Sequence, residues 1–504
     1  MHYQNPIIKG FNPDPSICRV GNEYYLAASS FEYFPGIPIY HSTDLVNWVQ
    51  LGNAIDRPGQ LPMALAKPSG GIWAPTLRYH RGTFYLTATF AERGNFIITS
   101  PTPGTGWSDP VWVEMAGLDP SLFFEDDALY YCANDFGRAE QGEGISVARV
   151  DPVTGRTLSP ITRIWQGTGG GFLEAPHLYH VGDWYYLFAA EGGTGLNHME
   201  TVARSRQLLG PYAGDPENPL LTNRHDTTKQ ALCCGHADLV EDTAGNWWIV
   251  HLGIRPAAGS MSHLGRETFL TPICWVNGWP KVLPGRRAAI TSEGPLTKPQ
   301  LPRTAWRDNF TKTAFGPEWL FVKEPVPQNY TRTGGTLVLR PTTALLTGEG
   351  ASPTFAAVRP LDFDCLFQTE LLFAPAEQGD EAGLALYLSP RYNYRIGVRR
   401  AADGDRLVVE KHADDFTELA FCAPAGEGKI RLIVRAAREQ YAFYYAWQGQ
   451  EPRLAATAST RFLCCELAGK CFTGTLAGLY AQAETETTAA AVFYDFSQTA
   501  GNEG

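Results

Sequence analysis

Length, composition and charge narrow the function classes before any motif is considered. The chain has 504 residues, of which 44% are hydrophobic and 12% aromatic, and its formal net charge is -11. This length predicts two domains, and the acidic balance without a concentrated basic face argues against a nucleic-acid partner. The chain start lacks a secretory signal and no apolar run approaches the roughly 18 residues of a membrane span, so we expect a cytoplasmic protein without a membrane partner.

A turn followed by paired aromatic residues and an apolar run recurs five times before residue 260. Such self-similarity predicts one four-stranded β unit for each copy, with the turn and the aromatics forming a hairpin. The copies are "GNEYYLAAS" at Gly21, "HRGTFYLTATF" at His80, "EDDALYYCAN" at Glu125, "VGDWYYLFAAE" at Val181 and "TAGNWWIVHL" at Thr243.

A second element precedes each aromatic pair by about ten residues, and it starts with a polar or aromatic side chain. The five elements begin at Asp14, Trp73, Asp119, Glu174 and His236. In a radial array of blades, equivalent positions at the start of the innermost strands face one axis. The sequence therefore predicts an all-β fold whose first domain, residues 1–290, is a five-bladed β-propeller with these side chains at its centre.

The repeats end at a segment rich in Pro, Ser and Thr, which predicts a linker over residues 291–305. Alternating runs such as "GTLVLR" and "GKIRLIVR" follow it. They predict a C-terminal antiparallel β-sandwich over residues 306–504 that packs on the propeller. The ten cysteines include the adjacent pairs Cys233/Cys234 and Cys464/Cys465, so we expect reduced thiols.

Three of the axial positions carry carboxylic acids, which indicates hydrolytic chemistry. Glycosidic bond cleavage needs one acid to protonate the leaving oxygen and one carboxylate on the opposite face of the sugar. Asp14, Asp119 and Glu174 supply this pair and a third acid that would raise the pKa of the proton donor. A lone Asp-Pro is usually a turn or a strand start; three acids at equivalent positions favour a functional site, because facing a crowded axis costs desolvation.

The remaining candidates have both a structural and a functional interpretation. His236 is either a core histidine or a ligand for an ion or a water on the axis. Trp73 and Phe31 are either core aromatics or walls on which a sugar stacks. Arg266 is either a surface cation or a guanidinium that binds a sugar hydroxyl and holds a carboxylate ionised.

The motifs "GFNPDPSI", "SGGIWAPTL", "GLDPSLFF", "EAPHLY", "CGHADLV" and "GRET" together resemble glycoside hydrolase family 43, and in particular its two-domain β-xylosidases. The resemblance implies an inverting, exo-acting enzyme that releases D-xylose from the non-reducing end of β-1,4-xylo-oligosaccharides. It implies Asp14 as general base, Glu174 as general acid and Asp119 as the residue that tunes the acid.

The same resemblance assigns substrate contacts to Phe31, Trp73, His236 and Arg266. Phe472 in "CFTG" is the candidate for a sandwich residue that closes the pocket. The chemistry requires no cofactor, although in some relatives the histidine that matches His236 lies beside a calcium ion through water. A small oligosaccharide is the expected partner, and similar enzymes suggest a homo-oligomer.

Three other functions stay open at this point. An α-L-arabinofuranosidase, or an enzyme with both activities, would present the same axis to a sugar with similar hydroxyl groups. A carbohydrate-binding propeller without catalysis is a different class, but a lectin has no need of three clustered acids. A fructan-active enzyme also uses five blades and three carboxylates, although "WAPTL" and "GHADLV" fit family 43 better.

Overall fold

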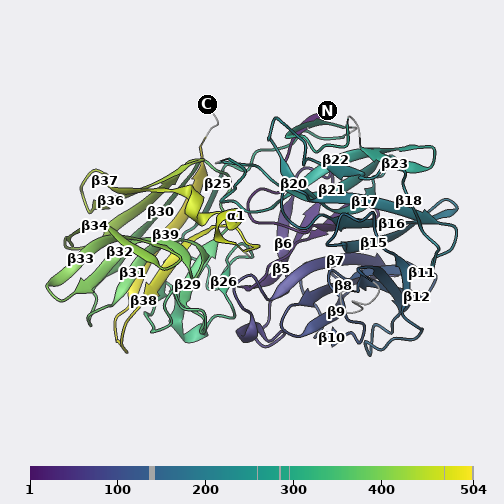
Figure 1. Cartoon of the computed structure of the whole chain (residues 1–504). Coiled ribbons are helices and arrows are strands. Elements are labelled where there is room, and N and C mark those ends of the chain that lie inside the picture. Colours follow the sequence, from purple (N-terminus) through teal and green to yellow (C-terminus); the bar gives the residue numbers. More distant parts are fainter. Residues whose placement is uncertain (136–141, 258, 283–284, 295, 470, 502–504) are drawn as a thin grey trace.

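A computed structural model describes residues 1–501 except 136–141, 258, 283–284, 295 and 470. Two β domains lie side by side (Figure 1), and the regular structure within the described ranges is almost entirely strand. The exceptions are short 3-10 turns and one α-helix, α1 (Cys465–Ala468). None of the helices in those ranges is long and apolar enough to cross a membrane.

The N-terminal domain is the expected five-bladed propeller, and in the described chain each blade contains four strands in sequence order. Their bounds, blade by blade, are β2 (Ser16–Val20), β3 (Glu23–Ala27), β5 (Gly36–Ser42) and β6 (Val49–Ile55); β7 (Ile72–His80), β8 (Thr83–Phe90), β9 (Gly94–Ser100) and β10 (Val111–Trp112); β11 (Ser121–Glu125), β12 (Ala128–Asn134), β13 (Ile145–Arg149) and β14 (Thr162–Trp165); β15 (Glu174–Val181), β16 (Trp184–Glu191), β17 (Met199–Ser205) and β18 (Ala213–Gly214); β20 (Leu232–Glu241), β21 (Trp247–Ile254), β22 (Glu267–Val276) and β23 (Trp279–Val282). A short strand β19 (Leu221–Thr222) also pairs with β17.

Tight turns join the inner two strands of each blade, as the repeated motif predicts. Between β7 and β8 the turn residues Arg81 and Gly82 both have positive φ, 48° and 86°. This backbone matches the right-handed twist of a hairpin. The aromatic residues of the motif then pack between blades; Tyr24 and Trp248, for example, are buried in one cluster that joins the first and last blades.

The ring closes without a strand exchanged between its two ends, because the first blade (β2, β3, β5 and β6) and the last blade (β20 to β23) each come from one continuous stretch of the chain. Instead, the segment before β2 runs along β22. The Asn12 N–H donates to the Arg266 carbonyl at 3.0 Å, and the Thr268 hydroxyl donates to the Asn12 carbonyl at 2.8 Å. This closure brings Asp14, near the start of the chain, next to Arg266.

The C-terminal domain consists of two antiparallel sheets in the described residues. One sheet contains β25 (Ala305–Asp308), β27 (Tyr330–Thr333), β28 (Thr336–Leu339), β30 (Cys365–Phe373), β35 (Ile430–Ala436), β36 (Gln440–Trp447), β37 (Arg453–Ser459) and β39 (Ala491–Ala500). The other contains β29 (Thr354–Val358), β31 (Glu381–Ser389), β32 (Tyr392–Ala401), β33 (Gly404–Ala413), β34 (Phe416–Pro424) and β38 (Leu476–Gln482). The expected sandwich is therefore present.

Two strand pairs tie the sandwich and the connecting segment to the propeller. In the segment expected as a linker, β24 (Thr291–Glu293) pairs with β1 (His2–Gln4). From the sandwich side, β26 (Phe321–Val322) pairs with β4 (Tyr33–Phe34), which lies just beyond Phe31. The connection is thus packed on the propeller, and the second domain reaches the region of the predicted pocket. All ten cysteines are free.

Candidate active site

The five inner strands share a left-handed residue where the chain turns into the strand, and this corrects the register predicted from the repeats. These residues are Asp14, Ala74, Asp119, Ala175 and His236, with φ between 37° and 57°. Trp73 and Glu174 therefore lie one position before the residues equivalent to Asp14, not at them. The prolines give the true register, since "DP" and "AP" align in the first four blades.

The one-residue offset of Trp73 and Glu174 has a structural reason in the second and fourth blades. Trp73 pairs with Thr89, and Glu174 pairs with Ala190, before a register shift interrupts each ladder. The side chains of Trp73 and Glu174 therefore leave an extended backbone, whereas that of Asp14 leaves a left-handed one. Non-glycine residues in this conformation carry strain and are concentrated at functional sites.

Asp14 is buried and is held as a carboxylate. Its Oδ1 accepts a hydrogen bond from Arg266 Nη1 at 2.8 Å, and its Oδ2 accepts one from Ser29 Oγ at 2.5 Å. His236 Nδ1 lies 3.8 Å from Oδ1. Burial alone would raise the pKa of Asp14, but Arg266, His236 and the Ser29 hydroxyl more than offset it and leave the pKa below its usual value. Asp14 is thus ready to accept a proton.

The pKa values of Asp119 and Glu174 are shifted in the opposite direction to that of Asp14. Burial, with the charge of Asp14, raises the pKa of Asp119 to about 6, although His236 and Arg266 act in the other direction. Burial, followed by the charges of Asp119 and Asp14, raises the pKa of Glu174 well above its usual value. One acid on the axis is therefore ionised while another keeps its proton near neutral pH, which is the division that acid–base catalysis needs.

Aromatic residues from both domains surround Arg266. The Phe472 ring of the sandwich stacks on Phe31 at a centroid distance of 6.1 Å and meets Trp73 edge-on at 6.1 Å. The guanidinium carbon of Arg266 lies 5.7 Å from the Phe31 ring centre and 5.9 Å from that of Phe472. All eight residues named from the sequence for the site are therefore gathered at one end of the axis; their roles toward a substrate stay predictions.

Two residues of this region, His198 and Glu200, were not identified from the sequence. His198 is buried, with Nδ1 3.0 Å from the Cys233 carbonyl, and burial, with His236 next, lowers its pKa to about 3. Glu200 Oε2 accepts the Ala237 N–H at 2.9 Å and so supports the turn at His236. Both lie on the same side of the alternating segment "HMETV", and that period of two is the signal that could have identified them.

The described residues do not present a direct metal-ligand set. No group of three or more His, Cys, Asp or Glu among them could hold an ion, and calcium prefers six to eight oxygen ligands. His236 Nδ1 lies 3.8 Å from a carboxylate oxygen of Asp14. A calcium ion held through water beside His236 therefore stays a prediction from the resemblance.

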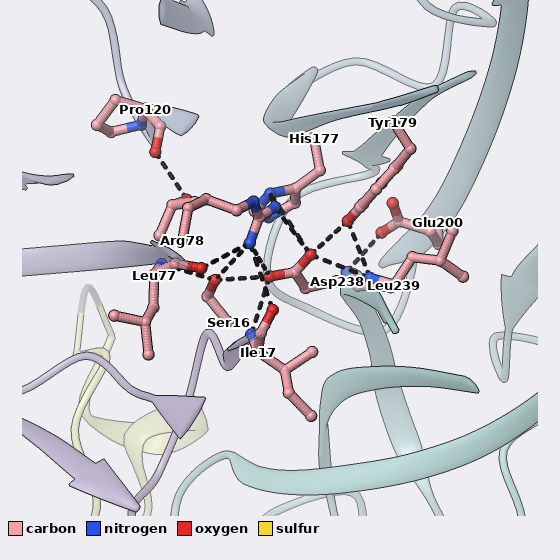
Figure 2. Close-up of polar contacts among 12 residues, drawn as sticks. Ser16, Ile17, Leu77, Arg78, Pro120, His177, Tyr179, Glu200, Asp238 and Leu239 are labelled. Carbon is pink, nitrogen blue, oxygen red and sulfur yellow. Dashed lines mark hydrogen bonds and ion pairs between the residues drawn. The ribbon is translucent and has the colours of Figure 1, made fainter. Parts of the chain in front are cut away.

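A second polar cluster lies further along the same inner strands (Figure 2). It is an ion pair between Arg78 and Asp238 in which both carboxylate oxygens accept several hydrogen bonds. Arg78 donates to both carboxylate oxygens of Asp238, at 2.8 and 3.0 Å, and to His177 Nδ1 at 2.9 Å. Asp238 also accepts from Ser16 Oγ at 2.6 Å and from the Tyr179 hydroxyl. Despite burial, Arg78 and His177 hold the pKa of Asp238 well below its usual range.

Each of the two domains matches a known protein family. The sequence model described as "Glycosyl hydrolases family 43" matches residues 3–280. The "Beta xylosidase C-terminal Concanavalin A-like domain" matches residues 307–499.

Similar proteins match along almost the whole chain. A non-reducing end α-L-arabinofuranosidase of Bacteroides ovatus is 39% identical over 95% of this chain and 91% of its own. A xylosidase/arabinosidase of Butyrivibrio fibrisolvens is 34% identical over 96% of each. The crystal structure of xylan β-1,4-xylosidase from Bacillus halodurans superposes with a TM-score of 0.92 and 32% identity, over 98% of this chain and 99% of that one.

Proposed function

The chain belongs to glycosyl hydrolase family 43, and from this premise we propose that it is an inverting, exo-acting hydrolase that releases D-xylose from the non-reducing end of β-1,4-xylo-oligosaccharides. The observation that carries the acid–base part of the proposal is the split in ionisation between Asp14, which accepts a hydrogen bond from Arg266 at 2.8 Å, and Glu174, whose pKa is raised by burial and by the charges of Asp119 and Asp14. Family membership and this split both argue against a carbohydrate-binding propeller without catalysis.

In the proposed reaction, Asp14 removes a proton from a water molecule, and the water oxygen attacks the anomeric carbon. Glu174 gives its proton to the departing glycosidic oxygen on the other face of the sugar. The configuration inverts, which requires room for the water and carboxyl groups about 6.5–9.5 Å apart. Asp119 acts through its charge, because it keeps the proton on Glu174 until the bond breaks.

Arg266 has two tasks in this scheme. Its guanidinium keeps Asp14 ionised from 2.8 Å, and it lies beside the aromatic walls where a sugar ring would stack. Phe472 from the sandwich narrows the same pocket. A pocket closed on one side suits the terminal sugar of a short chain better than the middle of a long one.

An α-L-arabinofuranosidase is the second candidate, alone or combined with xylosidase activity. It is favoured by the name of the Bacteroides ovatus relative at 39% identity, and the dual activity by that of the Butyrivibrio fibrisolvens relative. The Bacillus halodurans structure supports the xylosidase. The two sugars differ in ring size but offer similar hydroxyl arrangements.

Hydrolysis of matched aryl β-D-xylopyranoside and α-L-arabinofuranoside substrates separates the candidates. The proposal expects a higher kcat/KM for the xyloside, and for xylobiose it expects Glu174→Ala to lose nearly all activity. A preference for the arabinofuranoside would make the second candidate the main activity. Failure of the wild type to cleave either glycoside would overturn both.

Three expectations from the sequence remain part of the proposal: an activating calcium ion near His236, a homo-oligomer and a cytoplasmic location. Chelation followed by calcium addition tests the first, and unchanged activity after thorough chelation would contradict an essential ion. Light scattering tests the second, where a monomer at micromolar concentration would contradict it. Cell fractionation of the source organism tests the third.

A further inference from the structure

A loop of the sandwich touches the catalytic machinery through its main chain. The Phe472 N–H donates to Ser69 Oγ at 3.0 Å, and the Phe472 carbonyl accepts from Arg266 Nη2 at 3.1 Å. Three residues later, the Thr475 N–H donates to the His263 carbonyl at 2.9 Å. The loop is therefore anchored on the propeller along its length, independently of the Phe472 ring.

Two glycines make this approach possible. A Cβ built on Gly265 would lie 2.8 Å from the Gly474 Cα, and one built on Gly474 would lie 2.9 Å from the Phe11 Cβ and inside contact with the Leu264 carbonyl oxygen. Real Cβ atoms do not approach backbone so closely. Any side chain at position 474 would push the loop away from the segment of Leu264 to Arg266 that leads into β22.

Arg266 connects this loop to the general base. One of its terminal nitrogens donates to Asp14 at 2.8 Å while the other donates to Phe472 at 3.1 Å. The guanidinium is planar and rigid, so an anchor on one nitrogen fixes the direction of the other. Arg266 is 6% exposed, and no bulk water replaces a lost partner easily at such a position.

We propose that the main chain at Phe472 is a positioning element of the reaction, because its carbonyl orients Arg266 and Arg266 orients the carboxylate of Asp14. The sandwich then contributes to the chemical step as well as to the shape of the pocket. This inference rests on the proposed function. The competing explanation is that Phe472 acts through its ring alone, as a wall of the pocket.

A double-mutant cycle separates these two roles, since residues that act through one another are not additive. Gly474→Ala displaces the loop, and Arg266→Lys keeps the positive charge but cannot hold both partners. Against the better aryl pentoside, we expect Gly474→Ala to lower kcat/KM at least tenfold, on the order of what a small misplacement costs, mainly in kcat. In the Arg266→Lys background the same change should cost less than about twofold.

Gly350→Ala is the matched control, because Gly350 is in the same domain and a Cβ there meets nothing within 4 Å; its kcat/KM should equal that of the wild type. Ser69→Ala is a milder second variant, useful if Gly474→Ala does not fold, because it removes only the hydroxyl that holds the Phe472 N–H. Like Gly474→Ala, Ser69→Ala should lower kcat/KM less in the Arg266→Lys background than in the wild type.

Additive losses in both cycles would overturn the proposal and leave the ring as the only contribution of Phe472. Inactivity of the wild type on every pentoside would instead overturn the proposed function before the cycle begins. The two failures are therefore distinguishable.

Discussion

Two polar clusters on the propeller axis use the same inner strands and both contain buried charged side chains, yet they differ in how charge is balanced. At the catalytic end, Asp14, Asp119 and Glu174 share Arg266, and two of the three acids have raised pKa values. In the second cluster, Arg78 and Asp238 neutralise each other, and Asp238 stays ionised.

This difference in charge balance indicates which cluster of the propeller takes part in catalysis and which one stabilises the fold. A buried carboxylate with a full set of donors cannot easily take up or release a proton, so Asp238 contributes structure. Where carboxyl groups outnumber cations, the pKa of each acid depends on the charges of its neighbours. Such shifted pKa values suit general acid–base catalysis. Substitutions should therefore cost activity in the first cluster and stability in the second.

The largest expected effect is the loss of a catalytic acid. Asp14→Asn and Glu174→Gln should each lower kcat/KM for xylobiose by about 10²–10⁴, the usual contribution of general acid or base catalysis. Steady-state kinetics on substrates of graded leaving-group acidity separates the two roles. Glu174→Gln should recover most activity on an activated aryl glycoside, which needs no proton donor, whereas Asp14→Asn should not. Equal losses on all substrates would contradict these assignments.

In the second cluster, Arg78→Met should cost stability. It leaves the carboxylate of Asp238 buried without its cation, and breaking a buried pair costs about 3–5 kcal/mol in the free energy of unfolding. Chemical denaturation measures this loss. Arg81→Met is the control, because Arg81 pairs with Asp127 at an exposed position and should change little. An Arg78→Met variant as stable as the wild type would break the comparison.

Asp119→Asn should shift the pH dependence of catalysis. After burial, the charge of Asp119 is the largest cause that raises the pKa of Glu174. Without it Glu174 releases its proton at lower pH, so the alkaline limb of kcat/KM should move to lower pH. A pH profile of kcat/KM measures the limb, and an unchanged or raised limb would contradict the role of Asp119.

The smallest expected effect is a gain of stability in the same Asp119→Asn variant. Because the folded pKa of Asp119, about 6, exceeds its unfolded value, its contribution to stability is full at low pH and falls as pH rises through about 6. Above that pH the substitution should raise the free energy of unfolding by about 1 kcal/mol. Denaturation at pH 5 and pH 7.5 tests the sign; destabilisation at pH 7.5 would be inconsistent with a strained carboxyl cluster.

The architecture could be predicted because it repeats, whereas the site could be predicted only in part. Five copies of one hairpin motif indicate five blades, and Asp14 and Asp119 follow from them. The register at Trp73 and Glu174 was wrong by one residue, because the ladders shift there and periodicity does not reveal such a shift. Arg78 was missed, since its partners Asp238 and His177 come from other blades. Phe472, from the other domain, was found only through family resemblance.

The stereochemistry of the first product tests the central claim most directly. Proton NMR during the first minutes of xylobiose hydrolysis, before mutarotation, reports which anomer of xylose is released. A general base at Asp14 that activates water predicts α-xylose from the β-linked substrate. Initial release of β-xylose would mean a covalent intermediate and would contradict the assignment of Asp14 as a base.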